Sequence, residues 1–240
     1  MLAAREDADV ETSSEAYARR FAGPVGEFFL EVQAAATLDL LRPWPGSSLL
    51  EVGGGHGQLT GPLVEAGHDV TVYGSDPACE ARVRAWTAGG RARFASGDLL
   101  HAPFPDRSFD VVLAHRLLPH VRRFRELAAE LARLARRAVI VDYPTRRSVN
   151  AVGELFFDWK KRVEGDTRPF TVFPDREVEA AFAAHGLRPT ARRPEFLLPM
   201  ALHRATGSLA LARGLERAAA ALGLTRRFGS PVVLRLARDG

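Results

Sequence analysis

An acidic residue and a cluster of glycines stand together early in the chain: Glu51, Gly53, Gly54, Gly55 and Gly57. Glycine lets a ligand approach the backbone closely and adopts the positive φ that tight turns require. An apolar run precedes the cluster and an amphipathic segment follows it, which predicts a buried strand, a tight turn and a helix. The N–H groups at the start of such a helix point at whatever lies over the turn. The pattern favours a ligand-binding loop; a turn without a ligand is the alternative.

The glycine spacing argues against a dinucleotide site. A Gly-x-Gly-x-x-Gly fingerprint is absent in either register, because Gln58 or Thr60 stands where the third glycine is required. A nicotinamide-dependent oxidoreductase would also need a Tyr-x-x-x-Lys pair or an equivalent. Tyr143 is followed at that spacing by Arg147. This class of enzyme is therefore an unlikely alternative.

The Glu-x-Gly-x-Gly-x-Gly spacing resembles the first motif of the class I S-adenosylmethionine-dependent methyltransferases. The resemblance implies that the loop passes under the methionine part of S-adenosylmethionine and that Glu51 belongs to the hydrogen-bond network of the site. The residues it assigns to the cofactor here are Glu51, Gly53, Gly54, Gly55 and Gln58. We expect Gly55→Val to abolish cofactor binding and to leave the fold intact.

The second predicted strand, residues 70–73, departs from this resemblance. Relatives usually carry an acid near the end of this strand, where it accepts hydrogen bonds from the ribose hydroxyls, but Gly74 stands at that position. One interpretation is that Ser75 and Asp76 reach back to the ribose. The other is that Asp76 caps the next helix, which would start at Pro77.

Two further segments extend the resemblance. A third predicted strand, residues 91–96, leads into Gly97, Asp98 and Leu99. The resemblance implies that Asp98 accepts a hydrogen bond from the adenine amino group and that the backbone beside it meets the ring. Residues 103–110, Pro-Phe-Pro-Asp-Arg-Ser-Phe-Asp, resemble the segment before the fourth strand of methyltransferases of the ubiquinone/menaquinone-biosynthesis kind.

Two histidines follow the fourth predicted strand, His115 and His120. The Asn/Asp-Pro-Pro-Tyr/Phe element of methyltransferases that act on nucleobase or amide nitrogens is absent here, which favours an oxygen or carbon acceptor. The resemblance places His115 beside the cofactor. A histidine near its ordinary pKa could take a proton from a hydroxyl acceptor. Either histidine could instead be a hydrogen-bonded wall residue.

The N-terminal region is predicted to have two parts. Residues 1–13 are expected to be a disordered tail, and residues 14–45 a helical lid. Tyr17, Arg20 and Phe21 are candidates for contact with the ligand. Packing of the aromatic side chains into the core is the equal alternative.

Strands alternating with helices along the chain predict an α/β protein with a Rossmann-like, doubly wound sheet. We expect one methyltransferase domain over residues 14–240, with a cofactor-binding core at 46–142 and substrate-side insertions at 143–174 and 197–229. Further strands are expected at 138–142, 187–198 and 231–236, and helices at 122–137, 175–185 and 202–222. The resemblance implies seven mostly parallel strands, one of them antiparallel. Basic and aromatic side chains of the first insertion would suit a planar or anionic acceptor; they are Phe156, Phe157, Trp159, Lys160, Lys161, Arg162, Arg168, Phe170 and Phe173.

Composition restricts the partners. The net charge is +4 and the arginines are spread along the whole chain, so we expect no nucleic-acid partner. No apolar run is long enough to span a bilayer, and the single cysteine, Cys79, suggests a reducing compartment; a cytoplasmic location is expected. The sequence is compatible with a homodimer. A metal-dependent mechanism is not expected, because only Asp142, opposite His115, stands where acidic ligands would be needed.

These observations predict methyl transfer from S-adenosylmethionine to a hydroxyl or carbon of a small aromatic, quinone-like or other secondary metabolite. A cofactor-binding scaffold without catalysis is the alternative from another class of protein.

Overall fold

A computed structural model describes residues 5–148 and 170–238. Its centre is a seven-stranded sheet in the order β3-β2-β1-β4-β5-β7-β6. The strands are β1 (Ser48–Val52), β2 (Asp69–Gly74), β3 (Ala92–Ser96), β4 (Phe109–Ala114), β5 (Ala135–Tyr143), β6 (Leu187–Pro194) and β7 (Val232–Arg238). Strands β1 to β5 are parallel to one another, and β7 is antiparallel to both β5 and β6. The expected doubly wound sheet with one antiparallel strand is confirmed.

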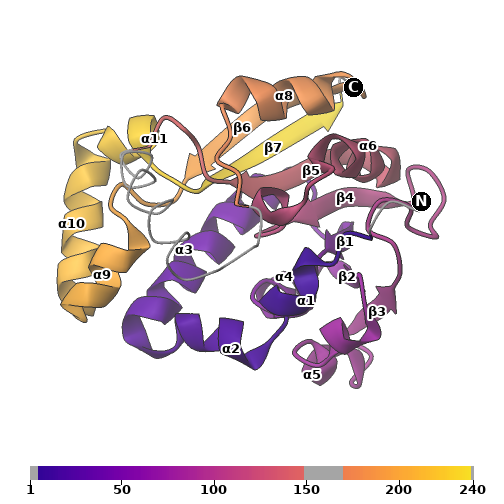
Figure 1. Ribbon diagram of the computed structural model, residues 1–240, viewed down its shortest axis with the longest axis horizontal. Helices are drawn as coiled ribbons and strands as arrows, with labels where there is room; N and C mark the ends of the chain where they lie inside the picture. The colour runs from indigo at the N-terminus through magenta and orange to yellow at the C-terminus, as the bar shows by residue number, and fades with distance from the viewer. Residues whose placement is uncertain (1–4, 149–169, 239–240) are drawn as a thin grey trace.

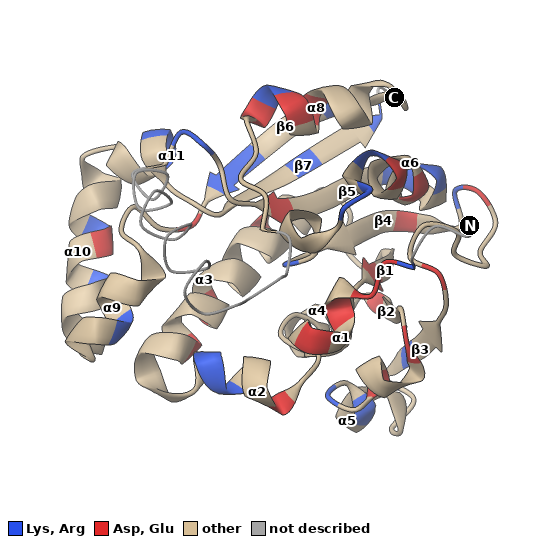
Figure 2. Ribbon diagram, viewed as in Figure 1, with Lys and Arg blue, Asp and Glu red and all other residues tan. Residues whose placement is uncertain are grey.

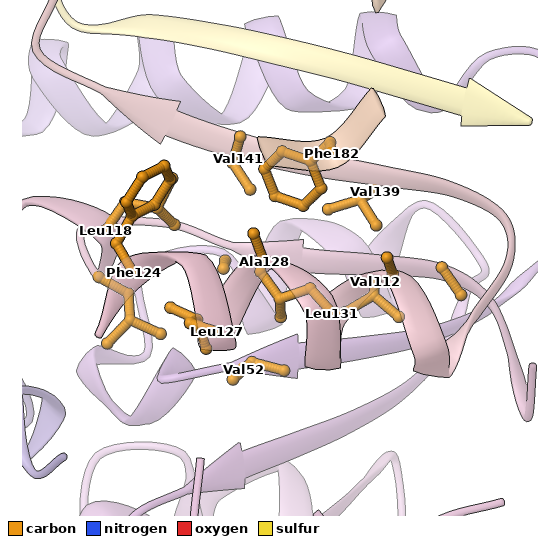
Figure 3. Close-up of a cluster of buried hydrophobic side chains, with 14 of the residues drawn as sticks. Val52, Val112, Leu118, Phe124, Leu127, Ala128, Leu131, Val139, Val141 and Phe182 are labelled. Carbon is orange, nitrogen blue, oxygen red and sulfur yellow. The ribbon is translucent and has the colours of Figure 1, made fainter. Parts of the chain in front are cut away.

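One face of the sheet is covered by α6 (Phe124–Leu134) and α8 (Asp175–Ala183). Alternate strand residues such as Val112, Val139 and Val141 point to this face and pack against Leu127 and Phe182 of the two helices (Figure 3). The alternation follows from the period of two along a strand. Strands buried on both faces read as continuous apolar runs, which is why the sequence located them well.

The opposite face is covered by α3 (Gly23–Leu41) and α4 (Thr60–Glu65). Here the intervening strand residues, among them Leu49, Val72 and Ile140, form a second buried cluster with Leu40 and Leu63. The two clusters hold the strands between two layers of helices. The positions of the strand ends, where ligands bind in open α/β sheets, are thereby fixed.

Most of the remaining helices gather around the carboxyl ends of the strands: α1 (Ala8–Thr12), α2 (Glu15–Ala18), α9 (Met200–Thr206), α10 (Leu209–Ala221) and α11 (Leu224–Phe228), with single 3-10 turns η1 (Arg19–Phe21), η2 (Gly54–His56), η3 (Pro77–Glu80) and η4 (Leu118–His120). The short helix α5 (Arg84–Thr87) instead precedes β3, and its Trp86 packs against the second buried cluster. Figure 1 shows α9, α10 and α11 grouped beside α3, and α1 lying over the region of β1 and β2. Arginines are dispersed among acidic residues over many elements (Figure 2).

Several boundaries differ from those expected. The expected helix at 202–222 is two helices, α9 and α10, because Gly207 adopts a left-handed conformation at φ +62° and interrupts it; Gly223, at φ +72°, separates α10 from α11. The sixth strand ends at Pro194 rather than at residue 198. Most of the first insertion, including Phe156, Phe157, Trp159, Lys160, Lys161, Arg162 and Arg168, lies outside the described residues. Phe173 is buried against Phe124 and Tyr143, and so belongs to the core.

The expectation of a disordered N-terminal tail is wrong for residues 5–13. They form an ordered segment that includes α1 and buries Glu6, Asp9, Thr12 and Ser13. Polarity alone suggested disorder, but the Asp9 and Glu6 side chains accept hydrogen bonds from backbone N–H groups just after β2 and just before α6, and the Thr12 and Ser13 hydroxyls donate to the Asp9 carbonyl. For example, the Arg122 and Arg123 N–H groups donate to the Glu6 carboxylate at 3.3 and 3.0 Å.

Candidate active site

The glycine loop lies at the carboxyl end of β1, as expected. Gly53 and Gly57 flank the η2 turn with φ of +71° and +68°, a region that residues with a Cβ rarely adopt. The Gly53 N–H donates to the Tyr73 carbonyl of β2 at 2.8 Å, which fixes the loop to the sheet. A Cβ on Gly54 would lie 2.4 Å from atoms of the Glu51 side chain. The sequence therefore specifies this turn locally.

Glu51 is fully buried under the loop. Its Oε2 accepts a hydrogen bond from the Thr60 hydroxyl at 2.8 Å, and its Oε1 has no partner within the described part of the chain. Burial raises the pKa of Glu51 to about 8, against the opposing effect of the Thr60 hydrogen bond. A carboxyl group of this kind is protonated at neutral pH and can donate a hydrogen bond to a ligand over the loop.

Other buried polar atoms near the loop also lack hydrogen-bond partners among the described residues. They are Asp9 Oδ1, Glu51 Oε1, His56 Nε2, Gln58 Oε1 and Ser75 Oγ. Buried polar atoms are normally paired, since leaving one unpaired costs about 1–3 kcal/mol. A set of donors and acceptors around a loop with no Cβ atoms fits a ligand with several polar groups, as S-adenosylmethionine has.

Asp9 of α1 supplies a carboxylate at the end of β2. It is fully buried, and its Oδ2 accepts a hydrogen bond from the Ser75 N–H at 2.7 Å. Arg5 donates a hydrogen bond to the Ser75 carbonyl. Gly74, where the resemblance led us to expect an acid, lies next to this contact. The N-terminal segment therefore brings to this place the carboxylate that β2 lacks.

Asp76 does not reach back toward the strand. Its Oδ1 accepts a hydrogen bond from the Ala78 N–H at 2.8 Å, and so it caps the η3 turn that starts at Pro77. This is the second of the two interpretations of Asp76. Ser75 is buried beside Asp9.

The Gly97–Asp98–Leu99 turn lies at the end of β3. The Asp98 Oδ1 accepts a hydrogen bond from the Leu100 N–H at 2.9 Å, which lowers the pKa of this carboxyl. The side chain is partly exposed, and Oδ2 lies 3.3 Å from His101 Nδ1. A Cβ on Gly97 would meet the Tyr73 hydroxyl at 2.3 Å. Contact of Asp98 with adenine stays a prediction.

The expectation that Gly55→Val would leave the fold intact is wrong. A Cβ at position 55 would lie 2.3 Å from Ser13 Oγ and 2.7 Å from both Cβ and the backbone oxygen of Cys79. The missing side chain of Gly55 therefore leaves room for Ser13 and Cys79 of neighbouring segments, as well as for any ligand. A valine would displace the N-terminal segment and η3.

The lid candidates have different surroundings. Tyr17 and Phe21 are buried, with ring centroids 5.6 Å apart, in an aromatic cluster with Phe28, Phe29 and Phe196. Arg20 is exposed and lies 3.6 Å from Glu11. The structure thus brings Tyr17 and Phe21 to the strand ends but leaves Arg20 at the surface.

His115 is a buried neutral side chain. Thr37 Oγ1 lies 2.9 Å from the Gln33 carbonyl oxygen and 3.1 Å from His115 Nε2. When the hydroxyl donates to the carbonyl, Nε2 is the donor in the second contact and the ring lone pair is on Nδ1, which has no partner among the described residues. Burial, and then the charge of Arg116, lowers the pKa of His115 to about 3. Our premise that this histidine has an ordinary pKa is wrong, and a base this weak is a poor proton acceptor.

His120 lies in the η4 turn and is partly exposed. Its ring centroid is 5.7 Å from that of Phe170. Its charge is among the effects that lower the pKa of Asp142 against the larger, raising effect of burial. Its catalytic role stays a prediction.

Arg116, which sequence analysis did not single out, lies directly after His115. Its backbone is left-handed, with φ +54°, and its N–H donates to Asp142 Oδ1 at 2.6 Å. The guanidinium carbon is 4.5 Å from the Phe21 ring centroid. The Nε and Nη2 atoms are buried and have no hydrogen-bond partner among residues 5–148 and 170–238.

Glu195 is a second residue that sequence analysis missed. It follows β6 directly, is buried, and neither carboxyl oxygen has a partner in the described ranges. Burial raises the pKa of Glu195 to about 8, although the Arg116 charge lowers it. The sequence analysis extended the sixth strand to residue 198, so Glu195 was assigned to the strand and not to the site that follows it.

Within the described residues no helix is long and apolar enough to cross a membrane, and no group of three or more His, Cys, Asp or Glu side chains is placed to hold a metal ion.

Comparisons with known proteins agree with this site. Residues 50–141 match the family described as "Methyltransferase domain". Nocamycin O-methyltransferase of Saccharothrix syringae is 40% identical over 117 residues, which are 46% of this chain and 41% of that protein. An uncharacterized methyltransferase of Anoxybacillus flavithermus is 36% identical over 76 residues, 32% of this chain and 35% of the other. The chain thus spans less than half the length of either relative.

Solved structures share the whole architecture. Magnesium protoporphyrin IX methyltransferase from Synechocystis PCC 6803 superposes with a TM-score of 0.64 at 14% identity, over 92% of both chains. Geranyl diphosphate methyltransferase gives 0.61 at 21% identity, over 87% of this chain and 78% of the other. The chain shares the seven-stranded fold of these methyltransferase structures, and its residues 50–141 match the methyltransferase domain family.

Proposed function

We propose that the protein transfers a methyl group from S-adenosylmethionine to an oxygen or carbon of a small aromatic, quinone-like or other secondary metabolite, without a metal ion. The observation that carries the proposal is the set of unpaired buried polar atoms around the glycine loop. The match of residues 50–141 to the methyltransferase domain supports it. The partial identity to an enzyme named as an O-methyltransferase favours oxygen.

The residues proposed to hold the cofactor come from four segments. The loop Gly53–Gly55, with Glu51 and Gln58, would lie under the methionine part. Asp9 and Ser75 would meet the ribose, and the turn at Asp98 and Leu99 the adenine. When bound, the cofactor supplies a methyl group on a positively charged sulfur, which is a good leaving group. The main task of the protein is then to orient the acceptor and exclude water.

The acceptor would lie where β4, β5 and β6 end. Tyr17 and Phe21 would cover this region, and the buried His115 Nδ1, which has no partner among the described residues, would be available to the acceptor. We further propose the ubiquinone/menaquinone-biosynthesis kind as the nearest subtype, on the strength of residues 103–110.

Calorimetric titration of the full chain with S-adenosylmethionine, S-adenosylhomocysteine and NAD tests the proposal. We expect both adenosyl ligands to bind and NAD not to bind. The Asp9→Asn variant should bind S-adenosylhomocysteine about tenfold more weakly, because a hydrogen bond to a charged group is lost.

Asp7→Asn is the matched control, since Asp7 is an exposed neighbour of the same segment. Binding of NAD alone would overturn the proposed function. Tighter binding of S-adenosylhomocysteine by Asp9→Asn would show that α1 competes with the ligand, and would overturn only the role of Asp9.

A further inference from the structure

The Arg116 guanidinium presents an unused pair of donors. Nε–H and one Nη2–H point the same way along one edge of the planar group, which is the geometry that binds two oxygens of a carboxylate. Both atoms are buried and unpaired among the described residues. The charges of Tyr17, Asp142 and Glu195 raise the pKa of Arg116 against burial, yet none of the described residues bonds to Nε or Nη2, so this edge is suited to an anion that enters the site.

The side chain of Arg116 has neighbours that limit its freedom. Tyr17 forms a side-chain hydrogen bond with Arg116, and the Phe21 ring lies 4.5 Å from the guanidinium carbon. The backbone is held by the hydrogen bond from its N–H to Asp142 Oδ1, while Nε and Nη2 have no partner among the described residues. A preorganised donor pair loses little entropy when it binds its ligand.

Positive charge is in excess around this edge. The guanidinium carbon of Arg204, from α9, is 5.6 Å from the same Phe21 ring, and burial together with the charge of Arg116 lowers the pKa of Arg204. Glu195 is near enough to Arg116 for their charges to interact, yet no ion pair joins the two side chains in the described structure. Burial raises the pKa of Glu195 to about 8 against the lowering effect of the Arg116 charge, which favours the protonated carboxyl as a hydrogen-bond donor at neutral pH.

We propose that the methyl acceptor carries an acidic oxygen group, a carboxyl or an enol of comparable acidity, which Arg116 binds as the anion through Nε and Nη2 while the Glu195 carboxyl donates to one of its oxygens. The inference rests on the proposed function. The acceptor arrives already deprotonated. One of its oxygens forms the new O–CH₃ bond as the S–CH₃ bond breaks, and the electron pair of that bond stays on sulfur. No base in the protein is needed, in agreement with the neutral, weakly basic His115.

The test uses the full chain saturated with S-adenosylhomocysteine and measures probe binding by calorimetry. The probes are benzoate with benzamide and 2-naphthoate with 2-naphthamide, pairs that match in shape and differ in charge. We expect an acid to bind at least about tenfold more tightly than its amide, as for a charge-assisted bidentate contact. Arg116→Met should remove this preference. Arg136→Met, at an exposed arginine paired with Asp110 at the start of β4, should keep it.

The outcomes separate the two proposals. Equal binding of acid and amide, no binding of any probe, or an unchanged preference in Arg116→Met would overturn the acidic acceptor while S-adenosylhomocysteine still binds. Failure of S-adenosylhomocysteine to bind would overturn the proposed function instead. Should Arg116→Met not fold, Arg116→Lys keeps the charge and loses the paired donors, and the acid–amide comparison on the unchanged protein decides by itself.

Discussion

Burial changes the pKa of several single residues at this site. Glu51 and Glu195 become weak acids and His115 a weak base, because the same desolvation disfavours the charged form of each. At neutral pH the three side chains are uncharged. Arg116 thereby stands out as the cation of the acceptor region, which explains why its unpaired edge matters more than the histidine that first drew attention.

The pH dependence of stability follows from these shifts. A folded pKa of about 8 for Glu51 against 4.5 in the unfolded chain means that the folded state holds an extra proton between these values. Its contribution is fully present below pH 4.5 and is lost as the pH rises toward 8, by up to about 1.4 kcal/mol per pH unit. His56 and His115 act in the opposite direction below pH 6.5, because their folded pKa values are lowered to about 3.

We therefore predict that Glu51→Gln flattens the fall in unfolding free energy between about pH 7 and 8, where the histidines are mostly neutral in the unfolded chain and neutral in the folded state. Urea unfolding at the two pH values measures it. Part of the slope should remain because of Glu195. The exposed Glu65→Gln is the control and should change nothing. A slope as steep in Glu51→Gln as in the unchanged protein would mean that Glu51 is ionised in the folded state.

At the scale of elements, carboxylates from distant segments hold the site together. Glu216 of α10 accepts hydrogen bonds from the Leu197 and Leu198 N–H groups at 2.9 and 3.0 Å, and lies 2.8 Å from His203 Nε2 of α9. These contacts fix the chain directly after Glu195. The segment 197–229 therefore helps to position Glu195, which we propose meets the acceptor, even though its own helices lie beside the sheet.

Glu6 plays a similar part at the start of α6. The residue that precedes this helix, Arg123, has no side-chain cap of its own, and the Glu6 carboxylate accepts hydrogen bonds from the N–H groups of Arg122 and Arg123. We predict that Glu6→Ala lowers the unfolding free energy by about 1–2 kcal/mol through loss of this cap and of its favourable position at the helix N-terminus.

Hydrogen exchange adds a readout specific to the element. In Glu6→Ala the amides of α1 should exchange faster, since one attachment of the N-terminal segment is gone. Asp7→Ala, which replaces an exposed neighbour, should leave both measurements unchanged. Two results together would contradict the ordered segment described above. They are a normal unfolding free energy in Glu6→Ala, and α1 amides that already exchange without protection in the unchanged protein.

At the scale of the whole molecule, two apolar clusters hold one sheet between two layers of helices, and the site lies along the carboxyl ends of the strands. A ligand over the glycine loop would contact both this sheet and α1. Binding to the folded state alone stabilises it by mass action.

We predict that S-adenosylhomocysteine at about a hundredfold excess over its Kd adds about 2.7 kcal/mol, and raises Tm by about 5–10 °C in a chain of this size. Differential scanning calorimetry measures the shift, with NAD at the same concentration as the control. A truncation that removes residues 1–13 should shift less, because α1 contributes to the site. An equal shift in the truncated chain would show that α1 takes no part in binding.

Local chemistry determined much of this protein from its sequence. Continuous apolar runs located the strands, and the glycine spacing located the loop and the turn that it forms, because both depend on residues adjacent in the chain. The position of Asp76 directly before Pro77 likewise indicated that Asp76 could cap the following turn. For the same reason the methyltransferase resemblance was strongest between residues 50 and 142.

Only the tertiary structure placed Asp9, Arg116 and Glu195. Asp9 lies in a polar segment that looks disordered until its carboxylate meets the Ser75 N–H, 66 residues away. The role proposed for Arg116 depends on Phe21, Asp142 and Glu195, which lie near it in the fold and far from it in the sequence. The pKa of His115 depends on burial, which no local pattern encodes. Contacts and desolvation between distant segments decided these features, and they are what distinguish this site from the glycine loop alone.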